Sequence, residues 1–187
     1  MKAFFSRYGY TVFKLFLNQF AIALFGVALA ISCGAAGRNT LLWVTSIFSV
    51  LFYLFLQYAV MWEVGANDGI SATARHENRK LWRGSVISLI ANSPNLLFAV
   101  LTLFPEGGRV ESVGRFLSLM LNGMYQGLLA QPFRGIQFNG FDWAYFAIIV
   151  PAVLVSSVAY ILGCYNLHAT NIFIPKNPDV KNNGRPD

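Results

Sequence analysis

The sequence predicts an all-helical integral membrane protein with four transmembrane helices and one amphipathic helix at the membrane surface. Of its 187 residues, 56% are hydrophobic and only 12% are charged, about half the charged fraction of an average soluble domain. Four stretches of about 20 residues contain no acidic residue, and at about 1.5 Å per residue each is long enough to cross about 30 Å of hydrocarbon. A soluble domain of this size has no use for four such segments.

The four expected spans cover residues 11–32, 41–62, 85–104 and 143–165. Tryptophan is enriched where a span meets the headgroups. Trp43 and Trp143 fall at one set of span ends, and Trp62 and Trp82 fall at or just beyond the other set. We therefore treat residues 1–187 as a single membrane domain that ends in a flexible, proline- and asparagine-rich tail at residues 175–187.

Residues 113–130 are apolar but short, and they are expected to lie in the interface. Their apolar residues recur at three- and four-residue steps, and Arg115, Ser118, Asn122 and Gln126 recur in the same way on another face. Opposed apolar and polar faces are typical of a helix that lies on a membrane. Gly123 and Gly127 form a GxxxG pattern, which in a helix that does not span is weak evidence for dimerisation.

The distribution of Lys and Arg favours four spans over five and sets the orientation. With both termini cytoplasmic, the inner side holds ten basic residues and the outer side four, whereas a fifth span reduces the split to eight against six. The positive-inside rule favours the first arrangement. The ten are Lys2, Arg7, Lys14, Arg75, Arg79, Lys80, Arg83, Lys176, Lys181 and Arg185, and the four are Arg38, Arg109, Arg115 and Arg134.

The N-terminal segment also has features of a secretory signal peptide. Lys2 and Arg7 precede an apolar run, and Ala28-Leu29-Ala30 resembles a small-residue cleavage site. The run is nevertheless long enough to span, and three further spans follow it. We therefore expect it to be the first transmembrane helix.

The inner loop is expected to cover residues 63–84 as a solvated connector, with a docking surface for a cytoplasmic partner as the alternative. Within it, residues 66–69 have the composition of a turn, and a short helix is expected after Ser71 as its cap. All eight acidic residues are then expected in loops or tails. Lys14 is the only charge inside an expected span, near an end where its stem can reach the headgroups.

No motif for phosphate, dinucleotide or zincin chemistry occurs in the chain. His76 and His168 do not make a metal site, which needs three or four ligands. Cys33 and Cys164 are expected at opposite faces of the membrane, so they cannot form a disulfide. The net charge of +6 is explained by the basic loops, and no nucleic-acid surface is expected. We expect no catalytic residue, cofactor or metal.

The nearest approach to a site is a layer of uncharged polar residues at similar depth in the four spans. Pro94 lacks an N–H and its ring clashes with the carbonyl of Ile90, so the third span is expected to kink there. The freed carbonyl needs a donor, which Asn18, Gln19 or Gln57 could supply. The layer is either structural or lines a solute site. Its members are Asn18, Gln19, Gln57, Asn92, Ser93, Pro94, Asn95, Ser156 and Ser157.

Three functions are compatible with this pattern. The favoured one is a non-catalytic subunit or scaffold component of a membrane complex, with the lipid bilayer and a protein or second copy as partners. Ala152, Ser156, Ala159 and Gly163 form a small-residue stripe that permits close helix contact. The alternatives are a transporter or permease subunit for an uncharged or amphipathic solute, and an enzyme that acts on lipid. A proton-coupled carrier is disfavoured, because no acidic residue falls in an expected span.

Overall fold

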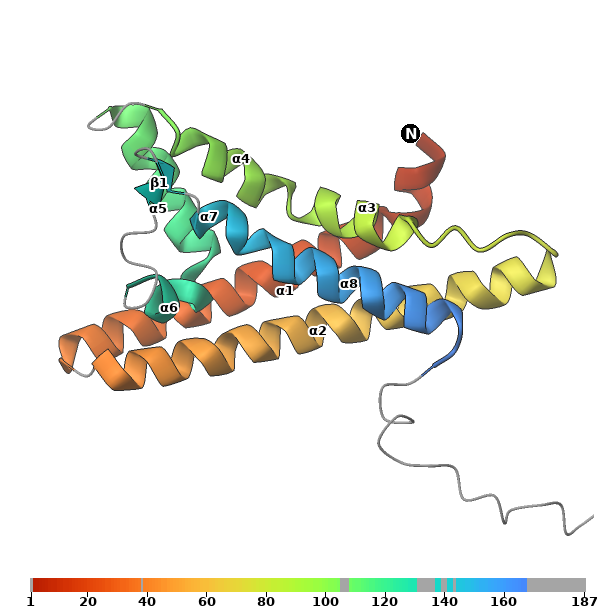
Figure 1. Ribbon diagram of the computed structural model, residues 1–187, viewed down its shortest axis with the longest axis horizontal. Coiled ribbons are helices and arrows are strands. Elements are labelled where there is room, and N and C mark those ends of the chain that lie inside the picture. The colour runs from red at the N-terminus through yellow and green to blue at the C-terminus, as the bar shows by residue number, and fades with distance from the viewer. Residues whose placement is uncertain are drawn as a thin grey trace, which may run out of the picture.

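The computed structural model describes residues 2–37, 39–104, 108–130, 137–138, 141–142 and 144–167. Two long antiparallel helices lie side by side, and a third long helix packs along them (Figure 1). Two short helices at residues 83–91 and 93–101 form a bent pair that covers the other side. The segment at residues 109–130 runs across the bundle and fills the space where this pair diverges from the long helices. The fold is therefore an all-helical bundle, as the sequence predicts.

The elements follow one another along the chain in this order. They are α1 (Lys2–Ala35), α2 (Asn39–Ala74), α3 (Arg83–Ala91), α4 (Ser93–Leu101), α5 (Arg109–Leu121), the 3₁₀ turn η1 (Gly123–Tyr125), α6 (Gln126–Ala130), β1 (Gln137–Phe138), β2 (Phe141–Asp142), α7 (Ala144–Ala147) and α8 (Ile149–Cys164). The two short strands form an antiparallel hairpin in which Phe138 pairs with Phe141.

Three helical stretches are long and apolar enough to cross a membrane, and the α3–α4 pair makes a fourth if it is counted as one span. The three are Phe4–Ala35, Thr40–Ala74 and Ala144–Cys164, and α3 and α4 meet at an angle of 51°. The bend falls at Asn92, two residues before Pro94. Pro94 stands in the first turn of α4, where its missing N–H is tolerated, and this agrees with the expected kink.

The structure corrects the expected inner loop. Residues 66–69 are helical, and Ser71 lies inside α2, where its hydroxyl donates to the carbonyl of Asn67 at 2.8 Å. The connector therefore begins only after Ala74. As a result, Glu63 and Asp68 belong to a helix and not to a loop. Tertiary contacts explain the extension, because α8 and α1 pack against α2 and side chains of α1, α3 and α8 bind Asp68.

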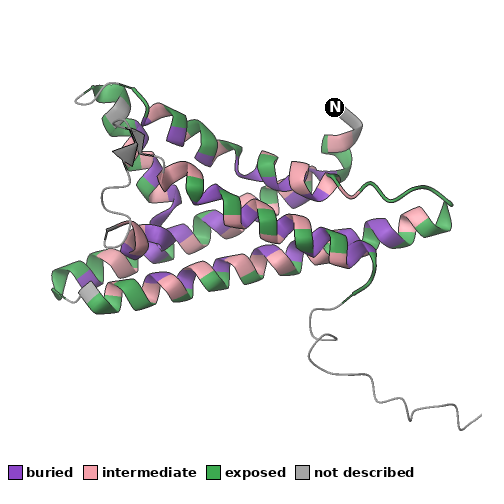
Figure 2. Ribbon diagram, viewed as in Figure 1, coloured by how far each residue is buried: buried purple, intermediate pink, exposed green. Residues whose placement is uncertain are grey.

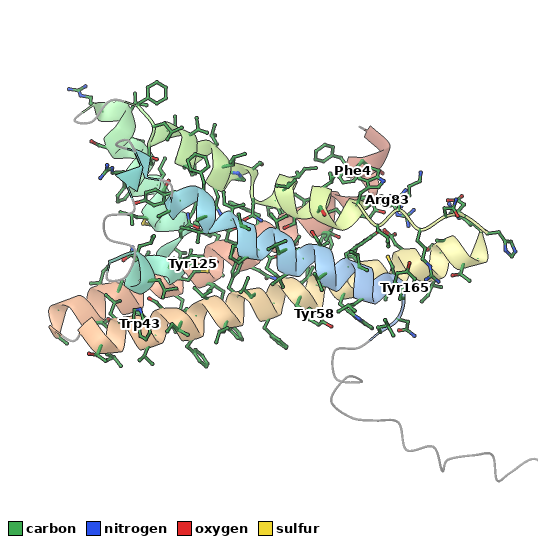
Figure 3. All side chains as sticks on the ribbon, in the orientation of Figure 1. Phe4, Trp43, Tyr58, Arg83, Tyr125 and Tyr165 are labelled. Carbon is green, nitrogen blue, oxygen red and sulfur yellow. The ribbon has the colours of Figure 1, made fainter. Side chains whose placement is uncertain are left out.

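The end of the bundle that carries residues 75–82 is called the connector end below. The N-terminus, the end of α2 and the end of α8 all lie toward it (Figure 1). Figure 3 shows Tyr165 at this end and Trp43 at the opposite end. Their side chains are 50% and 42% exposed, which suits an aromatic belt. Cys33 near the end of α1 and Cys164 at the end of α8 lie at opposite ends as free cysteines.

The expected surface helix begins at Arg109 and ends at Leu121, and the chain then breaks into η1 and α6. It runs across the direction of α1 and α2 and does not run parallel to them (Figure 1). The two faces of α5 meet different surroundings. Ser118 and Asn122 are buried, whereas Val113 and Phe116 are exposed. The polar side thus packs on the protein, and the apolar side is left for lipid.

Gly123 and Gly127 explain how this segment enters the bundle. A side chain on Gly123 would collide with the backbone of Ala23 in α1, and one on Gly127 with the backbone of Leu42 in α2. The amide of Gly127 also donates to Ser46 Oγ at 2.8 Å. The GxxxG pattern therefore serves contacts within the chain.

Buried residues form two clusters, one toward each end of the bundle (Figure 2). The cluster toward the connector end includes Leu15, Met61 and Ile87, all with no exposed surface. The other is built around Tyr53 and Met124. The outward faces of the long helices carry exposed apolar side chains such as Phe48 and Phe55, as expected of surfaces that meet lipid. The tail at 175–187, His168 and Trp143 lie outside the described residues.

Candidate functional site: a carboxylate joined to four helices

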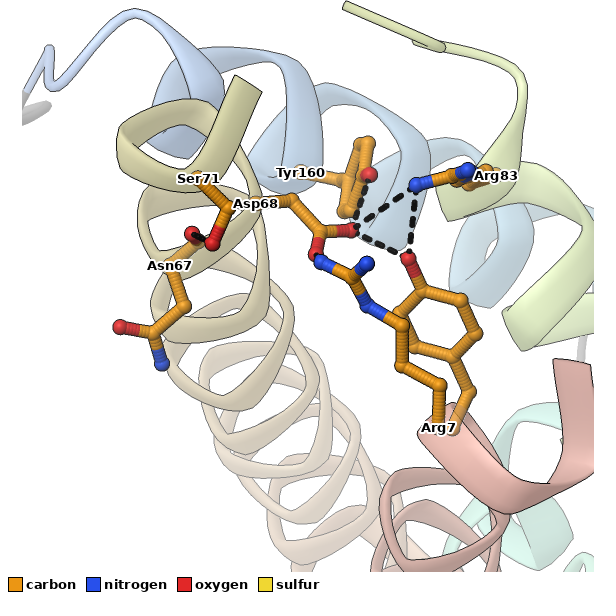
Figure 4. Close-up of polar contacts among 7 residues, drawn as sticks. Arg7, Asn67, Asp68, Ser71, Arg83 and Tyr160 are labelled. Carbon is orange, nitrogen blue, oxygen red and sulfur yellow. Dashed lines mark hydrogen bonds and ion pairs between the residues drawn. The ribbon is translucent and has the colours of Figure 1, made fainter. Parts of the chain in front are cut away.

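Asp68 occupies the centre of the connector end and is only 8% exposed. It lies on the inward side of α2, which is continuous with the buried side chains of Tyr53, Gln57 and Met61 at helical spacing. A buried carboxylate is costly unless it is paired and hydrogen-bonded. Four side chains from three other helices satisfy it (Figure 4).

Two tyrosines donate to the same carboxylate oxygen. Tyr8 of α1 and Tyr160 of α8 each place the phenolic hydroxyl 2.6 Å from Asp68 Oδ2. Both rings are buried, at 4% and 1% exposure. Hydrogen bonds to an ionised oxygen are about twice as strong as bonds between neutral groups, so these contacts hold α1 and α8 to α2.

Two arginines complete the arrangement. Arg7 of α1 donates through Nη2 to Asp68 Oδ1. Arg83, the first residue of α3, places Nη1 3.9 Å from Asp68 Oδ2 and donates from the same nitrogen to the hydroxyl of Tyr8 at 3.0 Å. We call Arg7, Tyr8, Asp68, Arg83 and Tyr160 the Asp68 cluster. It connects the ends of all the candidate spans through one carboxylate.

The chemistry of the cluster is that of a structural junction. Asp68 receives donors on both oxygens, from Arg7 on Oδ1 and from the two tyrosines on Oδ2. Tyr8 is both donor and acceptor and is likewise occupied. Two guanidinium groups against one carboxylate leave an excess of positive charge, and Arg7 is 43% exposed toward solvent.

Glycines at the α2–α8 contact bring Tyr160 within reach of Asp68. An added Cβ at Gly65 would overlap the carbonyl of Tyr160, and one at Gly163 would overlap the carbonyl of Trp62. The two backbones therefore touch directly, as small residues allow between membrane helices. The small-residue stripe that runs from Ala152 to Gly163 is buried in this contact, so it does not form an outward interface.

The predicted polar layer is assembled only in part. Gln57 is 1% exposed, donates from Nε2 to Tyr53 Oη at 2.9 Å and accepts from Ser156 Oγ at 3.3 Å. This group links α2 to α8 in the interior. Ser157 lies beside it in sequence but bonds elsewhere, with its hydroxyl 2.8 Å from that of Ser85 in α3.

The polar residues around the α3–α4 break bond mainly to one another. Asn92 donates from Nδ2 to the carbonyl of Ser88 at 2.9 Å and accepts from Asn95 Nδ2 at 3.4 Å. These bonds stay within the α3–α4 segment, and Asn92 is 2% exposed. Ser93, by contrast, is exposed, and Pro94 is half-buried.

Asn18 and Gln19 are not joined to these groups by any bond identified in the described chain. Gln19 is 2% exposed on the inward side of α1, and Asn18 is half-buried. The predicted layer thus divides into a Gln57 group, an Asn92 group, and separate positions on α1. Within the described ranges, no three side chains of His, Cys, Asp or Glu gather closely enough to hold a metal.

The sequence reasoning missed the Asp68 cluster because Asp68 was assigned to a turn. A signal was present in the spacing of α2. Tyr53, Gln57, Met61, Gly65 and Asp68 follow one another at steps of three or four, which continues one helical face past the expected end of the span. A polar residue on such a face predicts partners on the neighbouring helices, and Arg7 and Arg83 precede the first and third expected spans by four and two residues.

A scan against protein-family models, a search of curated proteins and a search of solved structures find no match to this chain. The fold and the length of its apolar helices define a multi-pass helical membrane protein.

Proposed function

We propose that this chain is a non-catalytic subunit or scaffold component of a membrane protein complex. The observation that carries the proposal is the Asp68 cluster, in which one buried carboxylate joins α1, α2, α3 and α8. The groups in that cluster satisfy one another. They support a role in holding the helices in a fixed arrangement, which a scaffold requires.

The packing between α2 and α8 supports the same function. Alternating access moves one group of helices against another around a central site. Here the two helices touch through backbone atoms at Gly65 and Gly163, and the interior polar group of Gln57 and Ser156 is bonded internally. A movement that opened the bundle would break both contacts.

A cysteine placed in the interior distinguishes a scaffold from a carrier. Ser156→Cys puts a thiol at a fully buried position in a background where Cys33 and Cys164 are replaced by Ala. In native membranes the scaffold protects this thiol from a small maleimide, whereas a carrier that alternates exposes it. Asn78→Cys in the exposed connector is the matched control for reactivity. Rapid labelling of Ser156→Cys would rule out the fixed bundle.

A subunit must also have a partner. We expect purification in mild detergent to yield a complex in which another chain, or a second copy, is present at a fixed stoichiometry. The same stoichiometry should survive size-exclusion chromatography. A monodisperse monomer from its own membranes, recovered without loss of bound chains, would contradict the proposal.

Orientation forms part of the proposal. The connector end carries Arg75, Arg79, Lys80 and Arg83, and the positive-inside rule places such an end in the cytoplasm together with both termini. An impermeant maleimide applied to intact cells should therefore label Arg109→Cys, at the opposite end, and spare Asn78→Cys. The reverse pattern would invert the topology.

One observation favours the transporter or permease alternative. The third span is broken by 51° at Asn92, and the buried Oδ1 of Asn95 has no hydrogen-bond partner within the described chain. Broken helices with free polar groups bind solutes in many carriers. Labelling of Ser156→Cys that a solute blocks would support this alternative.

A further inference from the structure

Two adjoining hollows lie at the connector end, and they differ in character. The first is a small pocket between the cluster and the connector, with five basic residues in its wall: Arg7, Arg75, Arg79, Lys80 and Arg83. Only two carboxylates, those of Asp68 and Glu77, share the same wall. The pocket therefore has an excess of positive charge.

Most of that excess comes from the connector side. Asp68 already pairs with Arg7 and Arg83. The ion pairs found among the described residues do not include Arg75, Arg79 or Lys80. Arg79 is held in place by other means, since its guanidinium lies 4.7 Å from the ring centroid of Tyr165 and contacts Thr73 Oγ1 at 3.4 Å. A positioned guanidinium suits a phosphate, which it can bind through two parallel hydrogen bonds.

The second hollow is apolar and lies between α2 and α8. It encloses about 400 Å³, within the range of about 300–1,000 Å³ typical of ligand sites. Ala66, Gly69 and Ala74 line one side, and Gly163 the other. The groove runs beside the close contact of the two helices, in which Gly69 and Gly163 approach the facing backbone. Arg79 and Cys164 line both hollows, so the groove adjoins the basic pocket.

The position along the bundle fits a lipid. Ile70 of α2 and Tyr165 after α8 line the groove and are 70% and 50% exposed. Apolar and aromatic side chains at span ends mark the boundary between hydrocarbon and headgroups. Arg75 follows Ile70 by five residues at the end of α2, and one helical rise per residue places it about 7.5 Å further toward the connector.

We propose that the connector end binds an anionic phospholipid, with its phosphate among Arg75, Arg79 and Lys80 and an acyl chain in the groove between α2 and α8. Basic pockets between membrane helices on the cytoplasmic side recognise anionic headgroups in this way. The placement of an apolar groove beside a basic pocket selects an amphiphile over a free phosphate ion, because an ion has no use for the apolar groove.

The test uses the full chain, delipidated in detergent, with native mass spectrometry to count bound lipids. Three probes are titrated: phosphatidylglycerol, phosphatidylcholine with the same chains, and glycerol 3-phosphate as the headgroup alone. We expect phosphatidylglycerol to bind at least about tenfold more tightly than phosphatidylcholine, as several charge contacts of about fivefold each require. Equal affinity for the two lipids would overturn the proposal. Tight binding of glycerol 3-phosphate alone would replace the lipid with a soluble phosphate ligand.

Variants locate the site. Arg75→Gln and Arg79→Gln should each weaken phosphatidylglycerol about fivefold, and Ile70→Ser should weaken long-chain lipid more than short-chain lipid. Arg109→Gln removes the same charge from an exposed position at the opposite end and should leave binding unchanged. If the Arg79→Gln variant does not fold, the Arg75→Gln and Lys80→Gln variants are used to test the site. A loss with Arg109→Gln as large as that with Arg75→Gln would show non-specific attraction and refute the site.

Discussion

The phenol of Tyr160 on α8 donates a 2.6 Å hydrogen bond to Oδ2 of Asp68 on α2, a residue 92 positions earlier in the chain. The contact depends on two local features. Asp68 must lie on the helical extension of α2, and the glycines of the α2–α8 contact must let the two backbones touch. The stability of the bundle is therefore expected to depend on this end of the molecule.

Removing the charge of Asp68 should destabilise the bundle. In Asp68→Asn, Arg7 and Arg83 lose their shared carboxylate, and one buried oxygen acceptor becomes a donor that faces two hydroxyls. Breaking a buried pair costs about 3–5 kcal/mol, and the partial exposure of Arg7 reduces this to about 2–3 kcal/mol. Unfolding in mixed micelles of dodecyl sulfate and mild detergent measures the change. Asn67→Ala, at the exposed neighbouring position, should change the free energy of unfolding by less than about 0.5 kcal/mol. Equal effects of the two variants would contradict the role of Asp68.

The two tyrosines should differ in their contribution. Tyr8→Phe removes a donor to Asp68 and the acceptor of the bond from Arg83, whereas Tyr160→Phe removes only a donor. Each bond to the carboxylate is worth about 1.5–3 kcal/mol, so Tyr8→Phe should lower the free energy of unfolding more. Tyr10→Phe is the control, since Tyr10 is 77% exposed on the same helix. A larger loss for Tyr160→Phe would show that the bond between Arg83 and Tyr8 adds nothing.

The close α2–α8 contact gives a prediction about shape alone. Gly163→Ala places a methyl group against the carbonyl of Trp62 and the amide of Ala66, neither of which can move without shifting α2. We expect a loss of about 1–3 kcal/mol, as for other overpacked sites. Gly34→Ala is the matched control, because no atom lies within 4 Å of its added Cβ. The thermal midpoints of the two variants in detergent should therefore separate. Coincident midpoints would mean that the helices are further apart than described.

The fold class and the number of apolar segments could be predicted from the sequence because each span depends on its own composition and length. The kink beside Pro94 was predictable for the same reason, since the missing N–H is a local property. The residue at which α2 ends could not be predicted in this way. Asn67, Asp68 and Gly69 are turn formers by local preference, and only contacts with α1, α3 and α8 keep them helical. Local preference yields where tertiary packing decides.

The candidate site was predictable to a smaller degree. Depth along a helix can be counted, so Gln57 and Ser156 were grouped at similar levels, and the structure joins their side chains by a hydrogen bond. Which face each helix turns inward depends on the packing of its neighbours. Asn18 was therefore grouped with residues to which the structure gives it no bond. The same limit applies to α5, whose Ser118 and Asn122 are buried on the protein.

The polar residues of the spans offer a prediction that separates structure from function. Asn92 is 2% exposed and bonds both to the Ser88 carbonyl and to Asn95. If this group stabilises the α3–α4 break, Asn92→Leu should lower the free energy of unfolding by about 1–3 kcal/mol, because the buried Asn95 amide loses its acceptor and the Ser88 carbonyl loses one of its two donors.

Asn18→Leu makes the same chemical change at a half-buried position on α1 and should be nearly neutral, within about 0.5 kcal/mol. Both variants are then assayed for recovery of the purified complex. If the Asn92 group is structural, Asn92→Leu should lower the thermal stability, and the complex should be lost only as the protein unfolds. If Asn92→Leu keeps its thermal midpoint but no longer recovers its partner, or no longer supports transport of a solute, the group acts as a site and the structural interpretation is wrong.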